Sequence, residues 1–165
     1  MENKELPKRK PNRLEKFDYG AGYSYFITIC TRNREKILSH IVGEDIILPQ
    51  NTITLTTHGQ IIEESILSIN NHYENVFVEQ YVIMPNHVHL ILTIQDNGRI
   101  ISSPTIPIIV GQLKRFSSKK AGVSLWQRSY YDHVIRNKSD YEQISKYIYE
   151  NPTNWETDEF YQKST

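Results

Sequence analysis

Two histidines, His87 and His89, are separated by one residue inside a run with the composition of a β-strand. Side chains alternate between the two faces of a strand, so both imidazoles are expected on the same face. Two neutral imidazoles side by side are a good pair of ligands for a divalent metal ion. Histidines at this spacing also arise from cross-strand packing or as surface residues, so the pair alone leaves a structural role open.

A tyrosine and an asparagine near the C-terminus form a second candidate for chemistry. Tyr147 and Asn151 are four residues apart on what the pattern predicts to be the last helix, so they lie together at one edge of its apolar stripe. They bring a phenol and a carboxamide to one spot. Taken in isolation, the pair is also explained by a half-buried aromatic residue and by an asparagine that ends the helix before Pro152.

Hydrophobic periodicity predicts the elements that must position these residues. Residues 25–31 are β-branched and aromatic and predict a strand. Side chains in 76–84 and 87–94 alternate with the period of a β-strand, and Pro85-Asn86 between them makes a turn, so the two segments predict a β-hairpin. Helical periodicity over 57–71, around 110–116 and over 140–151, the last with Ser139 as its N-cap, predicts three helices. Two short strand pieces over 41–48 and a strand over 125–135 complete the order.

This order predicts an α+β fold, in which a ferredoxin-like antiparallel sheet carries helices packed on one face. A doubly wound parallel sheet is disfavoured, because the tight hairpin excludes the long crossover that parallel neighbours need. We expect a single domain over residues 23–155. A basic N-terminal extension over residues 1–22 precedes it, and a C-terminal tail over residues 156–165 follows.

Composition limits the class of protein. With 165 residues, 38% of them hydrophobic and 23% charged, the chain is too apolar to be disordered and too polar for a membrane protein. The single cysteine, Cys30, excludes an internal disulfide and a multi-cysteine zinc site. No stretch reaches the length of a membrane helix, and the charged N-terminus is followed by no apolar signal core. We therefore expect a cytoplasmic protein without a membrane partner.

The formal net charge is 0, but the basic residues are segregated along the chain. Residues 99–138 contain eight Lys or Arg against one acidic residue, whereas residues 37–98 contain none against seven. A polyanion needs only one basic face, although any single basic run is also explained as solvated surface. The candidates for polyanion contact are Lys8, Arg9, Lys10, Arg13, Lys114, Arg115, Lys119, Lys120, Arg128 and Arg136.

Several motifs occur together in a fixed order along nearly the whole chain. They are Met84–His89, Trp126–Arg128, Tyr131–Arg136 and Tyr147–Pro152, preceded by the strand over 25–31 and Arg34-Glu35. In this order they resemble the HUH single-tyrosine transposases, and most of all their REP-associated branch, which is linked to repetitive extragenic palindromes.

The resemblance implies a catalytic site and a reaction. It implies that His87 and His89 bind Mg²⁺ or Mn²⁺ with Asn151 as third ligand, and that Tyr147, on a C-terminal helix over the sheet, is the nucleophile. The implied reaction is nicking and strand transfer of single-stranded DNA at REP-like or transposon-end hairpins, through a 5′-phosphotyrosine intermediate. The basic residues would bind this DNA at the nucleoid, and both a homodimer and a monomer fit the family.

Two other classes of protein compete with this interpretation. A catalytically silent hairpin-DNA-binding protein on the same fold would not need all the proposed catalytic residues, which are present here. An unrelated RNA-binding module or a phosphodiesterase with two histidine motifs is the other class. The phosphodiesterase would need a second H-x-[ST] motif, which this sequence lacks.

Overall fold

The structure, a computed structural model, describes residues 22–42, 52–95 and 104–161. The strands within these residues are β1 (Tyr23–Cys30), β2 (Ser39–Val42), β3 (Thr52–Leu55), β4 (Val76–Ile83), β5 (His87–Ile94) and β6 (Tyr131–Ile135). The helices are α1 (Thr57–Leu67), α2 (Ile69–His72), α3 (Ile106–Ala121) and α4 (Lys138–Glu150), with short 3₁₀ turns η1 (Arg32–Arg34) and η2 (Trp155–Thr157). Residues 1–21 of the expected N-terminal extension lie outside the described residues.

Four strands form one antiparallel sheet in the order β4-β5-β1-β6, and β2 pairs with β3 in a separate two-stranded sheet. Along the chain, the sheet strands and the helices between them follow the β-α-β-β-α-β order of the ferredoxin-like arrangement. The tight turn between β4 and β5 is the predicted hairpin. The α+β fold with a ferredoxin-like antiparallel sheet is thus confirmed.

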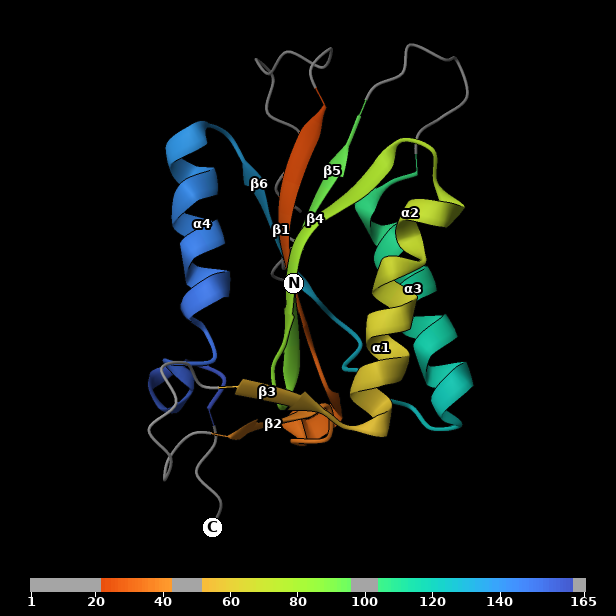
Figure 1. Ribbon diagram of the computed structural model, residues 1–165. Coiled ribbons are helices and arrows are strands. Elements are labelled where there is room, and N and C mark those ends of the chain that lie inside the picture. The colour runs from red at the N-terminus through yellow and green to blue at the C-terminus, as the bar shows by residue number, and fades with distance from the viewer. Residues whose placement is uncertain (1–21, 43–51, 96–103, 162–165) are drawn as a thin grey trace, which may run out of the picture.

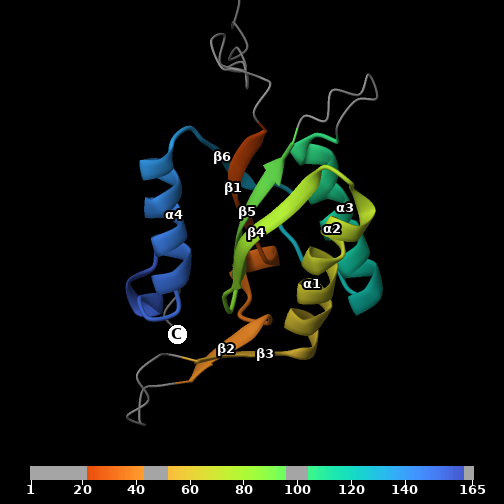
Figure 2. The same cartoon turned by 45° about the horizontal axis from the view of Figure 1, so that its top comes forward.

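Helices cover both faces of this sheet, which differs from the expectation of helices on one face. Figures 1 and 2 show α1, α2 and α3 on one side and α4 on the other. The cause is that the central strands carry apolar side chains on both faces. Ile27 and Leu90 belong to the core beneath α1 and α3, whereas Ile91 packs in a second core with Ile148 of α4.

The helix that carries Tyr147 begins earlier than the sequence predicted. The Asn137 side chain accepts a hydrogen bond from the Asp140 backbone N–H at 2.9 Å and is therefore the N-cap of α4. Ser139, the expected cap, lies inside the helix. The helix ends at Glu150, and the buried Asn151 follows as its C-cap.

The strand expected over 125–135 is shorter in the structure, because its first half is held by other interactions. Trp126 makes only an isolated bridge to Thr31, and its indole N–H donates to the Ser117 hydroxyl in the core. The ammonium of Lys114 donates to the backbone carbonyls of residues 127, 128 and 129, so regular pairing starts at Tyr131. Among the described residues, none of the helices has the length and apolar character that crossing a membrane requires.

Candidate active site

The two histidines of β5 lie side by side on the face of the sheet that α4 covers. Both are buried, and their ring centroids are 4.5 Å apart. The register places His89 opposite Thr28 of β1, and the Thr28 hydroxyl lies 2.8 Å from His89 Nδ1. Asn86 Oδ1 lies 2.8 Å from His87 Nδ1, and because this oxygen only accepts, Nδ1 carries the proton and Nε2 presents a lone pair. The neighbours therefore fix the orientation of both rings.

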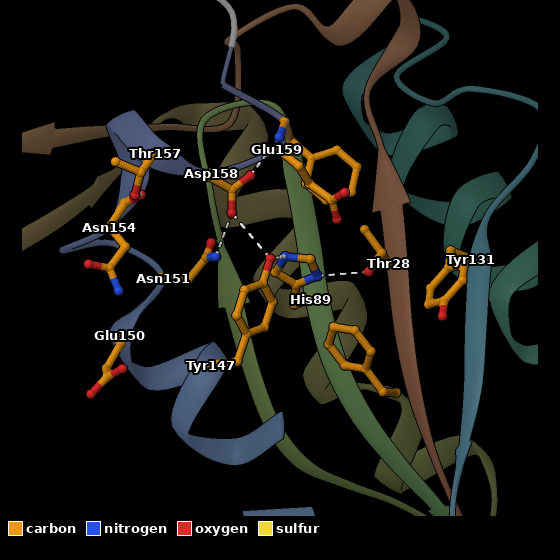
Figure 3. Close-up of a pocket in the computed structure, with 12 residues that line it drawn as sticks. Thr28, His89, Tyr131, Tyr147, Glu150, Asn151, Asn154, Thr157, Asp158 and Glu159 are labelled. Atoms are coloured by element: carbon orange, nitrogen blue, oxygen red, sulfur yellow. Dashed lines mark hydrogen bonds between the residues drawn. The ribbon is translucent and has the colours of Figure 1, made fainter. Parts of the chain in front are cut away.

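The C-terminal helix brings Tyr147 to the histidines. Its hydroxyl lies 3.4 Å from His89 Nε2 and donates a hydrogen bond to Asp158 Oδ2 at 3.2 Å. One turn further along, the Asn151 amide donates to the same carboxylate oxygen at 2.7 Å. Figure 3 shows these side chains converging from α4 and the segment after it on the β5 histidine. The structure thus brings together the four residues predicted from sequence, His87, His89, Tyr147 and Asn151.

Residues 156–161, which fall in the expected C-terminal tail, fold back over the histidines. The centroid of the Phe160 ring lies 4.6 Å from that of the His87 ring, and the guanidinium carbon of Arg34 lies over the Phe160 ring, 4.7 Å from its centroid. The Phe160 backbone carbonyl accepts a hydrogen bond from the Asn86 side-chain amide at 2.9 Å, and the Phe160 backbone N–H donates one to Asp158 Oδ1 at 2.7 Å. This segment therefore forms part of the wall of the site.

Burial sets the protonation of the site at neutral pH. It lowers the pKa of His87 to about 3, with the neighbouring Asn151 side chain offsetting part of the shift. Burial also lowers the pKa of His89 well below its ordinary value. The pKa of Tyr147 is raised, first by burial and then by the negative charge of Asp158. The imidazoles are thus uncharged and the phenol keeps its proton.

The residues present fit a divalent cation. His87 Nε2 and Asn151 Oδ1 are buried and have no hydrogen-bond partner among the described residues, an arrangement that normally costs stability. One ligand atom each from His87, His89 and Asp158 lies within 4.8 Å of the other two. Imidazole nitrogens with amide or carboxylate oxygens suit a divalent metal ion.

The carboxylate of Asp158 is better placed to orient Asn151 than to bind a cation itself. Its Oδ2 already accepts hydrogen bonds from Tyr147 and Asn151, and its Oδ1 accepts one from the Phe160 N–H. By accepting from the Asn151 amide nitrogen, it leaves the Asn151 oxygen as the free, unpartnered atom. The hydrogen bonds of Asp158 therefore suit it to orient the Asn151 side chain.

Among the described residues, none of the predicted polyanion-binding residues lines the pocket beside Tyr147. Lys114 is occupied by backbone carbonyls, and Lys120 pairs with Glu64. Helix α3, which carries both lysines together with Arg115 and Lys119, lies on the opposite face of the sheet from α4 (Figure 1). Arg128 and Arg136 are exposed near the two ends of β6. The remaining candidates, Lys8, Arg9, Lys10 and Arg13, lie outside the described residues.

Sequence reasoning missed Asp158 and Phe160. Both follow the irregular stretch after Pro152 and the 3₁₀ turn η2, so no helical or strand period relates them to Tyr147. The one available signal is the clustering of aromatic and acidic residues in Trp155–Tyr161, which is unusual for a solvated tail.

The chain is similar over most of its length to proteins of two bacteria. It is 32% identical over 177 aligned positions to an uncharacterised protein of Haemophilus influenzae, with 93% of each chain covered. It is 28% identical over 135 positions to a REP-associated tyrosine transposase of Escherichia coli K12, with 81% of this chain and 68% of that protein covered. No family model matches the chain.

The fold has a counterpart among solved structures. A REP-associated tyrosine transposase bound to a REP hairpin superposes with a TM-score of 0.62 at 23% identity, covering 87% of this chain and 74% of that one. Such low identity speaks for the fold alone. In sequence, the chain is similar to REP-associated tyrosine transposases.

Proposed function

We propose that this protein nicks single-stranded DNA at REP-like or transposon-end hairpins and rejoins strands through a 5′-phosphotyrosine on Tyr147, in a metal-dependent reaction. The observation that carries the proposal is the convergence of a tyrosine hydroxyl, 3.4 Å from His89 Nε2, with two buried, unpartnered ligand atoms on His87 and Asn151. The names of the relatives, a REP-associated tyrosine transposase and a protein bound to a REP hairpin, support the substrate class.

His87, His89 and Asn151 are the residues that would hold the cation, Mg²⁺ or Mn²⁺. When bound, such an ion supplies Lewis-acid polarisation of the scissile phosphate. The protein contributes two imidazoles that are already uncharged, so no proton must leave them before they bind a cation. It also contributes the Asp158 carboxylate, which turns the Asn151 oxygen inward.

Tyr147 performs the covalent step in this proposal. Its oxygen attacks phosphorus and forms the Tyr–O–P bond as the bond from phosphorus to the 3′ oxygen breaks. The phenol proton passes to the Asp158 carboxylate, which already accepts the hydrogen bond from this hydroxyl, and the released 3′ oxygen takes a proton from water. Attack by another 3′-OH reverses the step and joins strands, because the phosphodiester bond energy is kept in the intermediate.

The DNA on either side of the break would be held by the basic residues away from the site. The exposed Arg115, Lys119, Arg128 and Arg136 are suited to phosphate contacts, as are the basic residues of the N-terminal extension. We place the catalytic unit in residues 23–155, with the following segment to Tyr161 folded onto it. We place its action on DNA in the cytoplasm, at the nucleoid.

A denaturing gel tests the covalent step directly. Labelled single-stranded hairpin oligonucleotides from the repeats around the gene are incubated with the protein and Mn²⁺, and a DNA band shifted by the mass of the protein reports the adduct. Tyr147→Phe and a chelator should each abolish the band, while hairpin binding on a native gel persists. Tyr149→Phe is the matched control, since this tyrosine lies on the same helix, is 69% exposed and does not line the pocket at His89.

A second outcome would favour the alternative function. If the protein binds the hairpin on a native gel but no variant or metal condition yields an adduct, it is a catalytically silent hairpin-binding protein. A normal adduct in Tyr147→Phe would show instead that another residue is the nucleophile.

A further inference from the structure

A cavity of about 820 Å³ opens beside Tyr147 and is larger than the covalent step requires. Twelve residues line it, and Figure 3 shows Tyr131 of β6 and Tyr147 of α4 on opposite sides of His89. A volume in this range is typical of pockets that enclose a small organic ligand. A phosphate group at Tyr147 would occupy only a small part of it, so the rest has room for a neighbouring part of the substrate.

The wall facing Tyr147 across the sheet is aromatic and open. Tyr131 begins β6 opposite Thr28 of β1 and is 59% exposed, although it lines the cavity. Deeper inside, the Phe26 ring is stacked on His89 at 5.2 Å and meets the Tyr147 ring edge-on at 6.1 Å. An exposed aromatic ring at the mouth of a cavity with an aromatic floor offers a flat surface on which a planar group can stack.

The charge of the cavity selects the kind of planar group. Among the described residues that line it, Glu150, Asp158 and Glu159 carry carboxylates and none is a lysine or arginine. Away from the cation that the histidines and Asn151 would hold, phosphates are repelled from such a lining, whereas hydrogen-bond donors are attracted. Adenine, cytosine and guanine carry an exocyclic amino group that donates to a carboxylate, and thymine has none.

We propose that this cavity is a subsite for one unpaired, amino-bearing nucleobase next to the scissile phosphate, stacked on Tyr131 with its amino group toward the carboxylates. The inference rests on the proposed function, because DNA at Tyr147 is what brings a base to this cavity. Unpaired bases are commonly recognised by stacking on aromatic side chains and by hydrogen bonds to their edges.

Binding of simple probes tests the subsite without requiring cleavage. The probes are fluorescein-labelled single-stranded decamers of deoxyadenosine, deoxycytidine or thymidine, and a decamer without bases, and fluorescence anisotropy gives their dissociation constants in Mn²⁺. Stacking contributes about 1–3 kcal/mol per base, so Tyr131→Ala should weaken binding of the adenine and cytosine decamers about 5- to 150-fold. Tyr131→Phe should keep the affinity, and Tyr149→Ala, which removes an exposed tyrosine outside the cavity, should change little.

The probe without bases separates stacking from backbone contacts. Its affinity should be the same for the unaltered protein and Tyr131→Ala, as in a double-mutant cycle in which one partner is the base. The inference would be overturned if Tyr131→Ala lost as much affinity for the probe without bases as for the base decamers, or lost no affinity for the adenine and cytosine decamers. The thymidine decamer should bind more weakly than the other two, and Glu159→Gln should narrow that difference. Equal affinity for all three base decamers would refute the preference for an amino group.

These outcomes are independent of the test of the proposed function. All measurements can be repeated with Tyr147→Phe, which cannot form the covalent intermediate. If Tyr131→Ala weakens binding only of probes that carry bases, in a protein that never yields an adduct, the subsite stands and the proposed cleavage activity is wrong. If the protein forms the adduct but Tyr131→Ala weakens binding equally with and without bases, the proposed function stands and the subsite is wrong.

Discussion

Lowering the pH should destabilise this protein through its buried histidines. Burial holds the pKa of His87 at about 3, whereas an unfolded chain has the ordinary histidine value of 6.5. The unfolded state therefore takes up a proton below pH 6.5 that the folded state refuses, so the stability is fully present above pH 6.5 and is lost as the pH falls. From pH 7.5 to pH 5, the linkage relation gives a loss of about 2 kcal/mol for His87 alone, and His89 acts in the same direction.

Urea unfolding at pH 7.5, 6 and 5 measures this loss, with a chelator present so that bound metal does not contribute. The comparison is with His87→Gln, which keeps a polar side chain but removes the titrating group. Its free energy of unfolding should fall by about 2 kcal/mol less than that of the unaltered protein between pH 7.5 and 5. The absolute stability of the variant at pH 7.5 does not enter, because only the change with pH is compared.

An identical dependence on pH in the protein and in His87→Gln would refute the reasoning. It would mean that the His87 ring takes up a proton in the folded state near its ordinary pKa, and that water or a rearranged Phe160 segment reaches it. Near pH 6, protons would also compete with a cation for the ring nitrogen of such a histidine, whereas they do not compete for the buried, uncharged ring.

Further changes test the fold and the surroundings of Tyr147. A Cβ on Gly59 would lie 2.1 Å from the Leu38 carbonyl oxygen, so Gly59→Ala should lower the free energy of unfolding by at least the roughly 1–3 kcal/mol of overpacking. Gly111→Ala, in α3 with no atom within 4 Å of the added methyl, should raise it by about 0.5–1 kcal/mol, and equal urea midpoints for the two variants would contradict the close approach. Asp158→Asn removes one cause of the raised pKa of Tyr147 and should lower this pKa, which stays above its ordinary value because burial remains. The pKa of Tyr147 is measured by ultraviolet difference titration, in which the titration of the same protein with Tyr147→Phe is subtracted. An unchanged pKa in Asp158→Asn would show that the carboxylate does not act on the phenol.

The central hairpin was predictable because each of its signals is local. Alternation over 76–84 and 87–94 with Pro85-Asn86 between them specifies both strands and their tight turn, and the structure has β4 and β5 there. The same alternation placed His87 and His89 on one face. Helical spacing likewise placed Tyr147 and Asn151 together, since one turn of helix is enough to relate them.

The second covered face of the sheet was harder to predict. β5 is buried along nearly its whole length, so polar and apolar residues do not mark an inner and an outer face. The two histidines look like interruptions of an apolar run, although they lie on the face that α4 covers. Where the last helix docks depends on contacts such as Ile91 with Ile148, which are 57 residues apart in the chain and leave no periodic trace.

Asp158 shows where reasoning from spacing ends. It is seven residues beyond Asn151, past the end of the helix, and it reaches the site because the turn over residues 151–154 and η2 bring it back to the Asn151 amide. Its hydrogen bond decides which end of the Asn151 amide faces inward. The sequence can therefore indicate Asn151 as a candidate ligand, but only the folded segment shows what orients its side chain.

The strand β5 and the helix α4 contribute to the site in different ways. Alternate residues of β5 serve two purposes, because Val88 and Leu90 fill the core under α1 and α3 while His87 and His89 face α4. Pairing with β1 and β4 on its two sides fixes the register that keeps these sets apart, since a slip of one residue would exchange them. Tyr147, by contrast, is held by the docking of one helix against the second, smaller core. A change that loosens α4 without disturbing the sheet would therefore move both Tyr147 and Asn151 away from an intact histidine pair.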